Sequence, residues 1–305
     1  MVQKLAGVFA PISTPFRPDE EVDFEALRFN LGRYARTRIL GYLALGSNGE
    51  NKSLTEEEKL KVLEVIIECK APHQVVMAGA AYEAQRDTER FFRQAARAGA
   101  DFGLLLPPSY FRKQMTDEVL FRYFSTVADV SPLPVLVYNA PGFCGVTLSP
   151  GLVGRLAEHP NIAGMKDSAA SGIENFLVHR SERFHVLAGS VNFLFPAMLG
   201  GAVGGTVSLA NSFPELAVEL FDCGAARDRV KGPALQERAN RLNQAISGRY
   251  GVPGVKAAMN LAGYRGGIPR RPLLPLTPAQ FEEMRSFLVA EGVVAPVPNR
   301  DRSEP

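Results

Sequence analysis

The sequence predicts a (β/α)8 TIM barrel followed by a small C-terminal helical appendage. From residue 7 to about residue 221, eight short runs rich in apolar and β-branched residues alternate with amphipathic helical patterns. Each run is also apolar enough to be covered on both faces, as the strands of a parallel sheet are. A doubly wound sheet is the alternative, but eight consecutive strand and helix units in about 220 residues fit a closed barrel better.

The expected strands are short and regularly spaced. They cover residues 7–12, 41–45, 75–79, 102–106, 134–139, 162–167, 185–189 and 204–209. The helical patterns between them begin near Asp23, Thr55, Ala84, Thr116, Ser149, Ser171, Asn192 and Phe213. Thr55 and Thr116 each precede acidic residues, which is typical of a helix that starts with a capping hydroxyl and carries carboxylates in its first turn.

The pattern changes after the eighth unit. Helical patterns over 232–247, 255–262 and 278–291 are separated by Gly- and Pro-rich links, and no further strand signal follows. We therefore expect a catalytic barrel over 1–227 and a helical region over 228–293. The tail over 294–305, with three prolines and several charges, is expected to be disordered.

The composition excludes several classes of function. The 305 residues carry 34 basic and 32 acidic side chains, a net charge of +2, so nothing favours nucleic acid or an anionic membrane surface as a partner. The apolar runs are too short to span a bilayer, and the N-terminus enters a strand pattern at once, which leaves no room for a signal peptide.

Cysteine and histidine usage gives two more expectations. Cys69, Cys144 and Cys223 are an odd number of cysteines at wide spacing, which predicts free thiols and a cytoplasmic location. The four histidines are scattered and no Cys-x-x-Cys occurs, so a metal site has no support.

The strand expected over 162–167 carries a lysine near its end. Strict alternation would place Lys166 on the face of Ile162 and Gly164, opposite Ala163 and Met165. A lysine at a strand end usually extends its amine to water. The functional alternative is a Schiff-base nucleophile, whose amine must lose its proton and so benefits from a desolvated pocket.

The other strand ends decide between these readings, because a barrel of this kind has its active site at the C-terminal ends of the strands. Hydroxyls, amides and a phenol lie there, in the stretches 46–50, 138–143, 166–168, 189–190 and 204–208. Alone, the first stretch could be a plain turn and Tyr138 a core-edge tyrosine. A phosphate site on the last two strands is disfavoured, because no basic residue accompanies their glycines.

As an ordered set, these residues resemble the dihydrodipicolinate synthase and N-acetylneuraminate lyase family of Schiff-base lyases. The resemblance covers nearly the whole chain. It rests on Gly-x-x-Gly-Glu at 46–50, Tyr-Asn-x-Pro at 138–141, Gly-x-Lys at 164–166 and the glycine-rich eighth strand. The stretches 46–50, 164–168 and 187–190 are most similar to the 4-hydroxy-2-oxoglutarate aldolase branch.

The resemblance implies a role for each residue. Lys166 would form an imine with a 2-keto acid, Tyr138 would be the acid and base, and Ser47 would supply the hydroxyl of a proton relay. Tyr110 matches the tyrosine that a neighbouring subunit adds to that relay, although alone it could be a surface aromatic. The residues that would hold the substrate are Ser47 and Asn48 at its carboxylate, together with Ser168, Gly189, Thr206 and Phe143.

The resemblance also implies a function. The leading expectation is a class I aldolase that cleaves a short 2-keto acid and releases pyruvate, with 4-hydroxy-2-oxoglutarate giving pyruvate and glyoxylate. It implies no cofactor and a homo-oligomer, a tetramer built as a dimer of dimers. The alternatives are a 2-keto-3-deoxy sugar acid aldolase or dehydratase, a dihydrodipicolinate synthase, and a non-enzymatic barrel that binds keto acids as a regulator.

Two departures from the resemblance bear on the substrate. The lysine-pathway synthase carries an arginine two residues after the proline of Tyr-Asn-x-Pro, where Phe143 stands here. This difference argues against dihydrodipicolinate synthesis. The sialic-acid lyases carry acidic residues just after the strand-seven glycine to hold a polyol, whereas Val191 and Asn192 stand there in this chain. A long sugar acid bound in that way is therefore disfavoured.

Overall fold

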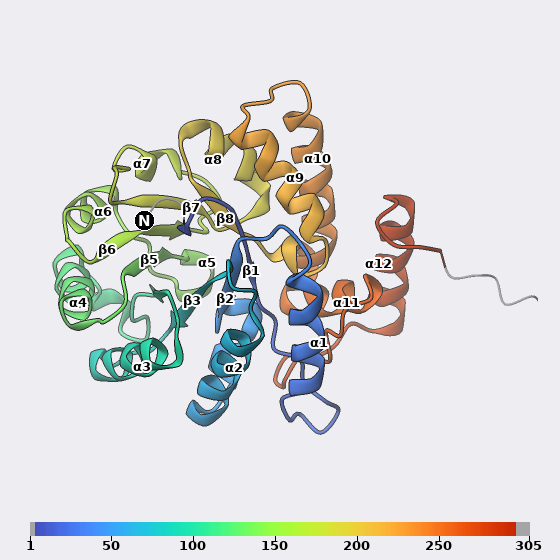
Figure 1. Ribbon diagram of the computed structural model, residues 1–305, viewed down its shortest axis with the longest axis horizontal. Helices are drawn as coiled ribbons and strands as arrows, with labels where there is room; N and C mark the ends of the chain where they lie inside the picture. The colour runs from blue at the N-terminus through green and yellow to red at the C-terminus, as the bar shows by residue number, and fades with distance from the viewer. Residues whose placement is uncertain (1–3, 297–305) are drawn as a thin grey trace, which may run out of the picture.

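The computed structural model describes residues 4–296 and contains a closed barrel of parallel strands. The strands are β1 (Val8–Pro11), β2 (Gly41–Ala44), β3 (Val75–Ala80), β4 (Phe102–Leu105), β5 (Val135–Asn139), β6 (Ile162–Asp167), β7 (His185–Ala188) and β8 (Gly204–Thr206). Each strand pairs with the next, and β8 pairs with β1, so the sheet has no free edge (Figure 1). The predicted fold class is confirmed.

Helices surround the barrel. They are α1 (Phe24–Tyr34), α2 (Glu56–Cys69), α3 (Gln85–Ala98), α4 (Asp117–Val130), α5 (Pro141–Cys144), α6 (Pro150–Ala157), α7 (Glu174–Leu177), α8 (Leu194–Gly200) and α9 (Pro214–Ala225). Thr55 begins α2 in a capping box with Glu58, and the Thr116 side chain accepts the Val119 N–H at the start of α4. Both capping predictions are confirmed. The helix expected to begin near Ser171 is a single turn that begins at Glu174.

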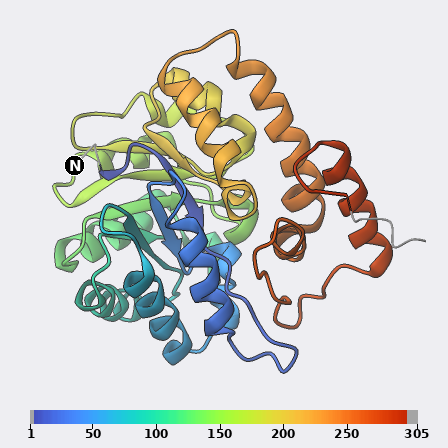
Figure 2. The ribbon, with the colours of Figure 1, turned by 45° about the vertical axis from the view of Figure 1, so that its right-hand side comes forward.

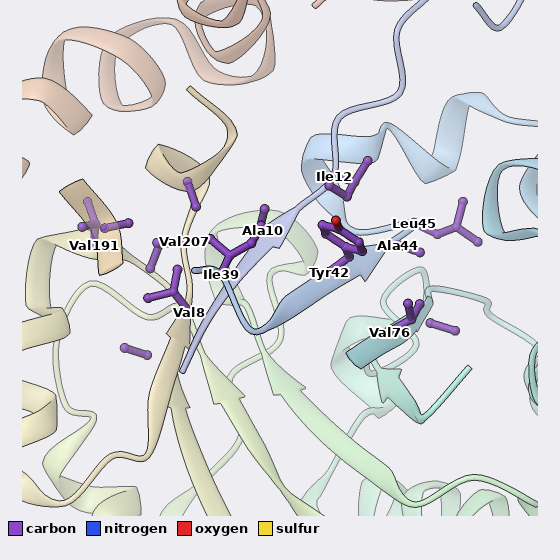
Figure 3. Close-up of a cluster of buried hydrophobic side chains, with 14 of the residues drawn as sticks. Val8, Ala10, Ile12, Ile39, Tyr42, Ala44, Leu45, Val76, Val191 and Val207 are labelled. Atoms are coloured by element: carbon purple, nitrogen blue, oxygen red, sulfur yellow. The ribbon is translucent and has the colours of Figure 1, made fainter. Parts of the chain in front are cut away.

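Apolar side chains form two layers, one inside the barrel and one between the strands and the helices. Phe9 and Leu43 belong to the interior layer. Figure 3 shows part of the outer layer, in which Ala10 of β1 lies near its register partner Tyr42 of β2. Because strand residues alternate, the residues that face inward near the strand ends converge on one mouth of the barrel.

One strand departs from strict alternation. The pairing of β6 with β5 skips Ala163, because Ile162 pairs with Val135 while Gly164 pairs with the next residue of β5. Ile162 therefore packs in the outer layer and Ala163 in the interior, the reverse of the faces that alternation predicts. The assignment of these two faces from the sequence was wrong. From Gly164 on, the alternation resumes as far as Lys166.

The C-terminal helices lie along one flank of the barrel (Figures 1 and 2). They are α10 (Gly232–Asn243), α11 (Arg249–Leu261) and α12 (Pro278–Ala290), and a π-helical turn (Gln244–Gly248) joins the first two. Gly251 has a positive φ of 58° near the start of α11, so the regular part of this helix begins only beyond it. The boundary expected at 227/228 falls between α9 and α10, and the division into domains stays a prediction.

Two sequence expectations concern the C-terminal tail and membrane-spanning segments. The tail over 294–305 lies largely outside the described residues, so its disorder stays a prediction. Within residues 4–296, no helix has the length and apolar character that crossing a membrane requires.

Candidate active site

A cavity of about 490 Å³ opens at the C-terminal ends of the strands. Its walls come from the segments after β2, β3, β4 and β5 and from the beginning of α11. Ser47, Tyr138 and Phe143 all line it, so the structure brings these three sequence-predicted residues together. The wall is mostly apolar, which favours a small ligand held by a few polar groups.

Lys166 lies beside Tyr138 on the neighbouring strand. The two are register partners on β6 and β5, and the Lys166 Nζ lies 4.2 Å from the centre of the Tyr138 ring. Lys166 is 5% exposed and Tyr138 is 2% exposed. The amine is therefore held in a largely desolvated position next to a phenol, not extended to water as the ordinary reading of a strand-end lysine expects.

Ser168 joins the ends of three strands. Its N–H donates to the Asn139 carbonyl at 2.8 Å, and its hydroxyl lies 3.2 Å from both the Tyr138 hydroxyl and the Gly189 carbonyl. A Cβ on Gly189 would lie 2.0 Å from the Ser168 Oγ, so only glycine permits this approach. Ser168 therefore links the Tyr138 phenol to the Gly189 backbone, and the role of both residues in substrate binding stays a prediction.

The turn after β2 carries the proposed carboxylate ligands. Ser47–Gly49 is one turn of 3-10 helix, and the first N–H groups of such a turn have no acceptor within it. The Asn48 side chain donates to the Ser208 Oγ at 2.7 Å, and the Thr14 hydroxyl donates to the Gly49 carbonyl at 2.8 Å. These contacts from the ends of β8 and β1 fix the direction of the turn.

Thr206 lies inside the barrel. It is the register partner of Phe9, which belongs to the interior layer, and register partners in a parallel sheet share a face. Thr206 is 1% exposed, and its hydroxyl has no hydrogen-bond partner within the described residues. An unpaired buried hydroxyl is costly, so a ligand that reaches it would be favoured.

Phe143 and Tyr110 are both exposed aromatics, but only Phe143 lines the cavity. Tyr110 is 80% exposed, and its ring meets Phe111 edge-on at 5.1 Å between centroids. Within one chain, Tyr110 therefore does not join Ser47 and Tyr138. Its backbone is nevertheless fixed, because its N–H donates to Glu83 at 2.9 Å.

Sequence comparison identifies the family of this barrel. Residues 4–291 match the Dihydrodipicolinate synthetase family. The chain belongs to this family. The resemblance inferred from the strand-end motifs is thus confirmed. As a family member the protein is an enzyme with carbon–carbon lyase chemistry, and the non-enzymatic alternative was wrong.

The curated relatives of this family member carry three different activities. An L-threo-3-deoxy-hexylosonate aldolase of Aspergillus niger is 30% identical, over 90% of this chain and 92% of its own length. A 4-hydroxy-tetrahydrodipicolinate synthase of Methanothrix thermoacetophila is 32% identical over 92% and 95%. A probable mitochondrial 4-hydroxy-2-oxoglutarate aldolase of Emericella nidulans is 32% identical over 87% and 88%.

A solved structure of the family has the same fold. It is the E. coli K12 prophage protein YagE in complex with pyruvate, and it superposes with a TM-score of 0.87. The two sequences are 26% identical, over 94% of this chain and 99% of that one.

The sequence did not indicate that the C-terminal region reaches the cavity. Tyr250, Gly251, Val252 and Pro253, at the start of α11, line it together with Leu273. Nothing in the local pattern places a segment more than 100 residues beyond β5 against the mouth of the barrel. The helical region of this family member is therefore part of the site's wall and not only an appendage.

Sequence reasoning also missed a buried pair behind the lysine and the phenol. Asn139 and Asp167 are register partners that directly follow Tyr138 and Lys166, and the Asn139 amide donates to the Asp167 carboxylate at 2.7 Å. Burial raises the pKa of Asp167, while hydrogen bonds from the Ala169 N–H and from Asn139 act in the opposite direction. The pair could have been found by noting that the residue after each proposed catalytic residue is polar.

Lys52 was not among the predicted site residues either. It lines the cavity, and its Nζ donates to the Ala81 carbonyl. Burial lowers the pKa of Lys52. The only sequence signal was a lysine close after the Gly-x-x-Gly-Glu motif.

A second cavity of about 390 Å³ is lined by Ser168, whose hydroxyl also donates to the Tyr138 hydroxyl. Ser168, Ser190 and Asn192 are the polar side chains of its lining, which is otherwise apolar. Asn192, one of the two residues that stand where the polyol-binding lyases carry acids, lines this cavity. Val191 instead packs in the outer apolar layer and is 1% exposed.

Proposed function

We propose that this enzyme is a class I aldolase that cleaves a short 2-keto acid through an imine on Lys166 and releases pyruvate. The observation that carries the proposal is the buried contact between Lys166 and Tyr138 at the mouth of the barrel. The solved relative with pyruvate supports the same choice of keto acid. No step of this chemistry requires a cofactor.

The first step is attack of the neutral Lys166 amine on the 2-keto carbon. Lys166 is 5% exposed and its Nζ lies beside the Tyr138 ring, so the amine is placed next to the group that moves protons in the following step. The carbinolamine loses water as Tyr138 donates a proton to the leaving hydroxyl, and the product is an iminium. Ser168, 3.2 Å from the phenol, supplies a hydrogen-bond partner as that proton moves.

The iminium then accepts the electrons of the bond that breaks. Tyr138, now a phenolate, takes the proton of the substrate's 4-hydroxyl, and the C3–C4 electrons move into the iminium to form an enamine. The aldehyde leaves. Protonation of the enamine at C3 and addition of water release pyruvate and restore the Lys166 amine. The Ser47–Asn48 turn holds the carboxylate next to the reacting carbon throughout.

We propose 4-hydroxy-2-oxoglutarate as the substrate, which would give pyruvate and glyoxylate. Its distal end is a second carboxylate, and the main cavity contains a cation, Lys52, that could bind it. The Emericella nidulans relative named as a probable aldolase of this compound supports the choice. Phe143, in place of a charged residue, argues against dihydrodipicolinate synthesis.

A second candidate is a 2-keto-3-deoxy sugar acid, either cleaved or dehydrated. The second cavity favours it, because Ser168, Ser190 and Asn192 offer hydrogen bonds there to the hydroxyls of a longer chain. The Aspergillus niger relative, an L-threo-3-deoxy-hexylosonate aldolase, is consistent with this alternative.

The two candidates are separated by a substrate panel. Purified enzyme is assayed for pyruvate release from 4-hydroxy-2-oxoglutarate and from 3-deoxy-hexulosonates of each configuration. The proposal expects the highest kcat/KM for 4-hydroxy-2-oxoglutarate. A preference for a hexulosonate would replace it with the second candidate, and formation of a dehydrated keto acid without pyruvate would indicate a dehydratase.

We also propose that the enzyme is a homotetramer, a dimer of dimers, in which Tyr110 reaches the site of a neighbouring subunit. Tyr110 is exposed and does not line the cavity of its own chain, so its hydroxyl is free to reach the cavity of a neighbouring subunit. This supports the proposed assembly. A cytoplasmic location is proposed from the three cysteines, all of which are free thiols in the structure.

A further inference from the structure

A buried ion pair lies next to the turn after β2. The Glu50 carboxylate and the Lys256 ammonium are 2.6 Å apart, and their side chains are 2% and 1% exposed. Lys256 belongs to α11, so the contact joins the end of a barrel strand to the C-terminal helical region. None of the chemistry proposed above uses these two charges.

Glu50 is fixed to the turn that precedes it. Its N–H donates to the Ser47 carbonyl at 3.1 Å, and it has a left-handed backbone conformation with φ 53° and ψ 40°. A residue other than glycine keeps such a conformation only where surrounding contacts hold it. The Arg270 N–H donates to the Glu50 Oε2 at 3.0 Å, which supplies one of those contacts, and Lys256 supplies another.

Lys256 is held as firmly on its own side. Its Nζ donates to the carbonyls of Thr14 at 2.7 Å and Ile268 at 2.6 Å, so three acceptors surround one ammonium. Thr14 also donates its hydroxyl to the Gly49 carbonyl at 2.8 Å. The turn is thus held at Gly49 by Thr14 and at Glu50 by Lys256.

Burial lowers the pKa of Lys256 to about 8, although Glu50 acts to raise it. Burial of this pair is therefore costly. Replacing a buried ion pair by apolar residues is often neutral for stability. Stability alone does not require the charges, and their position beside the turn indicates a use in the site.

We propose that Glu50 and Lys256 are a positioning pair that holds the Ser47–Gly49 turn in the shape that binds the substrate carboxylate. Through Lys256, α11 becomes part of the framework of the substrate site. This inference rests on the proposed function, because it takes the carboxylate to bind at Ser47 and Asn48.

The test compares a substrate that has the carboxylate with one that lacks it. The rate of imine formation, trapped by borohydride and read by intact mass, is measured for pyruvate and for its uncharged amide, pyruvamide. The ratio of the two rates is the carboxylate preference. It is measured for the wild type, Glu50→Gln, Lys256→Met and the double variant. The control is Arg241→Met, which removes the ion pair to Glu291 in the same helical region, away from the turn.

The proposal expects the carboxylate preference to fall about tenfold or more in all three variants, with the pyruvamide rate nearly unchanged. Lys256→Met alone leaves a buried unpaired carboxylate and should lower the Tm, whereas the double variant should regain much of the Tm. Its carboxylate preference should stay low. Arg241→Met should keep the wild-type preference.

Other outcomes overturn the proposal. If the carboxylate preference recovered together with the Tm in the double variant, the pair would be merely structural. An unchanged carboxylate preference in Glu50→Gln would show that the shape of the turn does not depend on the charge of Glu50. A wild type that forms an adduct with neither compound would refute the imine mechanism itself, and the basis of this inference with it. A wild type that forms both adducts equally fast would refute the carboxylate site alone.

Discussion

Tyr138 and Lys166 are register partners on adjacent strands, and the Lys166 Nζ lies 4.2 Å from the centre of the Tyr138 ring. Two backbone strands fix this relationship, since β5 and β6 pair without interruption from Leu136 to Asn139. Asn139 follows Tyr138 and Asp167 follows Lys166, and these two residues are hydrogen-bonded to each other. Their contact holds the same two strand ends together from the outer face. The amine and the phenol are thus positioned by rigid elements, as a catalytic pair requires.

Replacing the lysine should abolish imine chemistry. We expect wild-type protein treated with pyruvate and borohydride to gain one pyruvyl group per chain, mapped to Lys166 by peptide analysis. Lys166→Ala should gain none and should lose pyruvate release, because the imine forms on this amine and Lys166 is the lysine whose Nζ lies beside the Tyr138 ring. Lys61→Ala, which removes an exposed lysine of α2, is the matched control and should retain the adduct. An adduct that persists in Lys166→Ala would refute the mechanism.

Removing the phenol should slow proton transfer and leave the fold intact. We expect Tyr138→Phe to reduce kcat by about 10²-fold or more, since positioned acid–base groups typically contribute that much. The ring stays, so its packing beside Lys166 and the Tm should be close to those of the wild type. Steady-state kinetics and thermal unfolding check both parts, and near-normal turnover would remove the proposed role of Tyr138.

The strands and most of the candidate site could be predicted from the sequence because both follow local rules. Short apolar runs separated by capped helical patterns predict parallel strands, and the residues after each run must meet at one mouth. Ser47, Tyr138 and Lys166 could be placed in this way. The faces of Ile162 and Ala163 could not, because the extra residue in β6 is visible only in its pairing with β5.

The contribution of the C-terminal helices could not be predicted either. Lys256 is an ordinary lysine in a helical pattern, and its partner Glu50 lies 206 positions earlier in the chain. Tyr250 and Gly251 likewise reach the cavity because α11 packs against the segment after β1 and the turn after β2. Contacts of this kind come from tertiary packing, which periodicity and capping signals do not encode.

Binding of a distal carboxylate on the substrate should depend on Lys52. We expect Lys52→Met to raise KM for 4-hydroxy-2-oxoglutarate roughly tenfold or more, because a hydrogen bond between charged groups is lost. For 4-hydroxy-2-oxopentanoate, which has a methyl group in place of that carboxylate, the variant should behave like the wild type. An equal effect on both substrates would show that Lys52 does not recognise the distal carboxylate.

Assembly should be required for full activity. We expect analytical ultracentrifugation to show a tetramer, and Tyr110→Phe to keep that tetramer while reducing turnover by about 10²-fold, because the relay loses one hydroxyl. Phe111→Leu changes the neighbouring exposed aromatic and should keep the turnover of the wild type if it stays tetrameric. A fully active monomer would contradict the proposed role of Tyr110.

The buried histidine of β7 should make the fold sensitive to acid. His185 is 3% exposed and its Nε2 has no partner within the described residues, and burial lowers its pKa below the usual 6.5. The unfolded chain therefore binds a proton near pH 6.5 that the folded chain accepts only at a lower pH. The unfolding free energy should fall as the pH drops below 6.5, by at most about 1.4 kcal/mol per pH unit from this group.

Urea unfolding between pH 5 and pH 8 measures this dependence. His185→Gln cannot take up the proton, so its stability should decrease less steeply below pH 6.5 than that of the wild type, whatever its stability at neutral pH. His73→Gln, which changes an exposed histidine, should keep the wild-type slope. Equal slopes for His185→Gln and the wild type would show that His185 is protonated as readily in the folded chain as in the unfolded one.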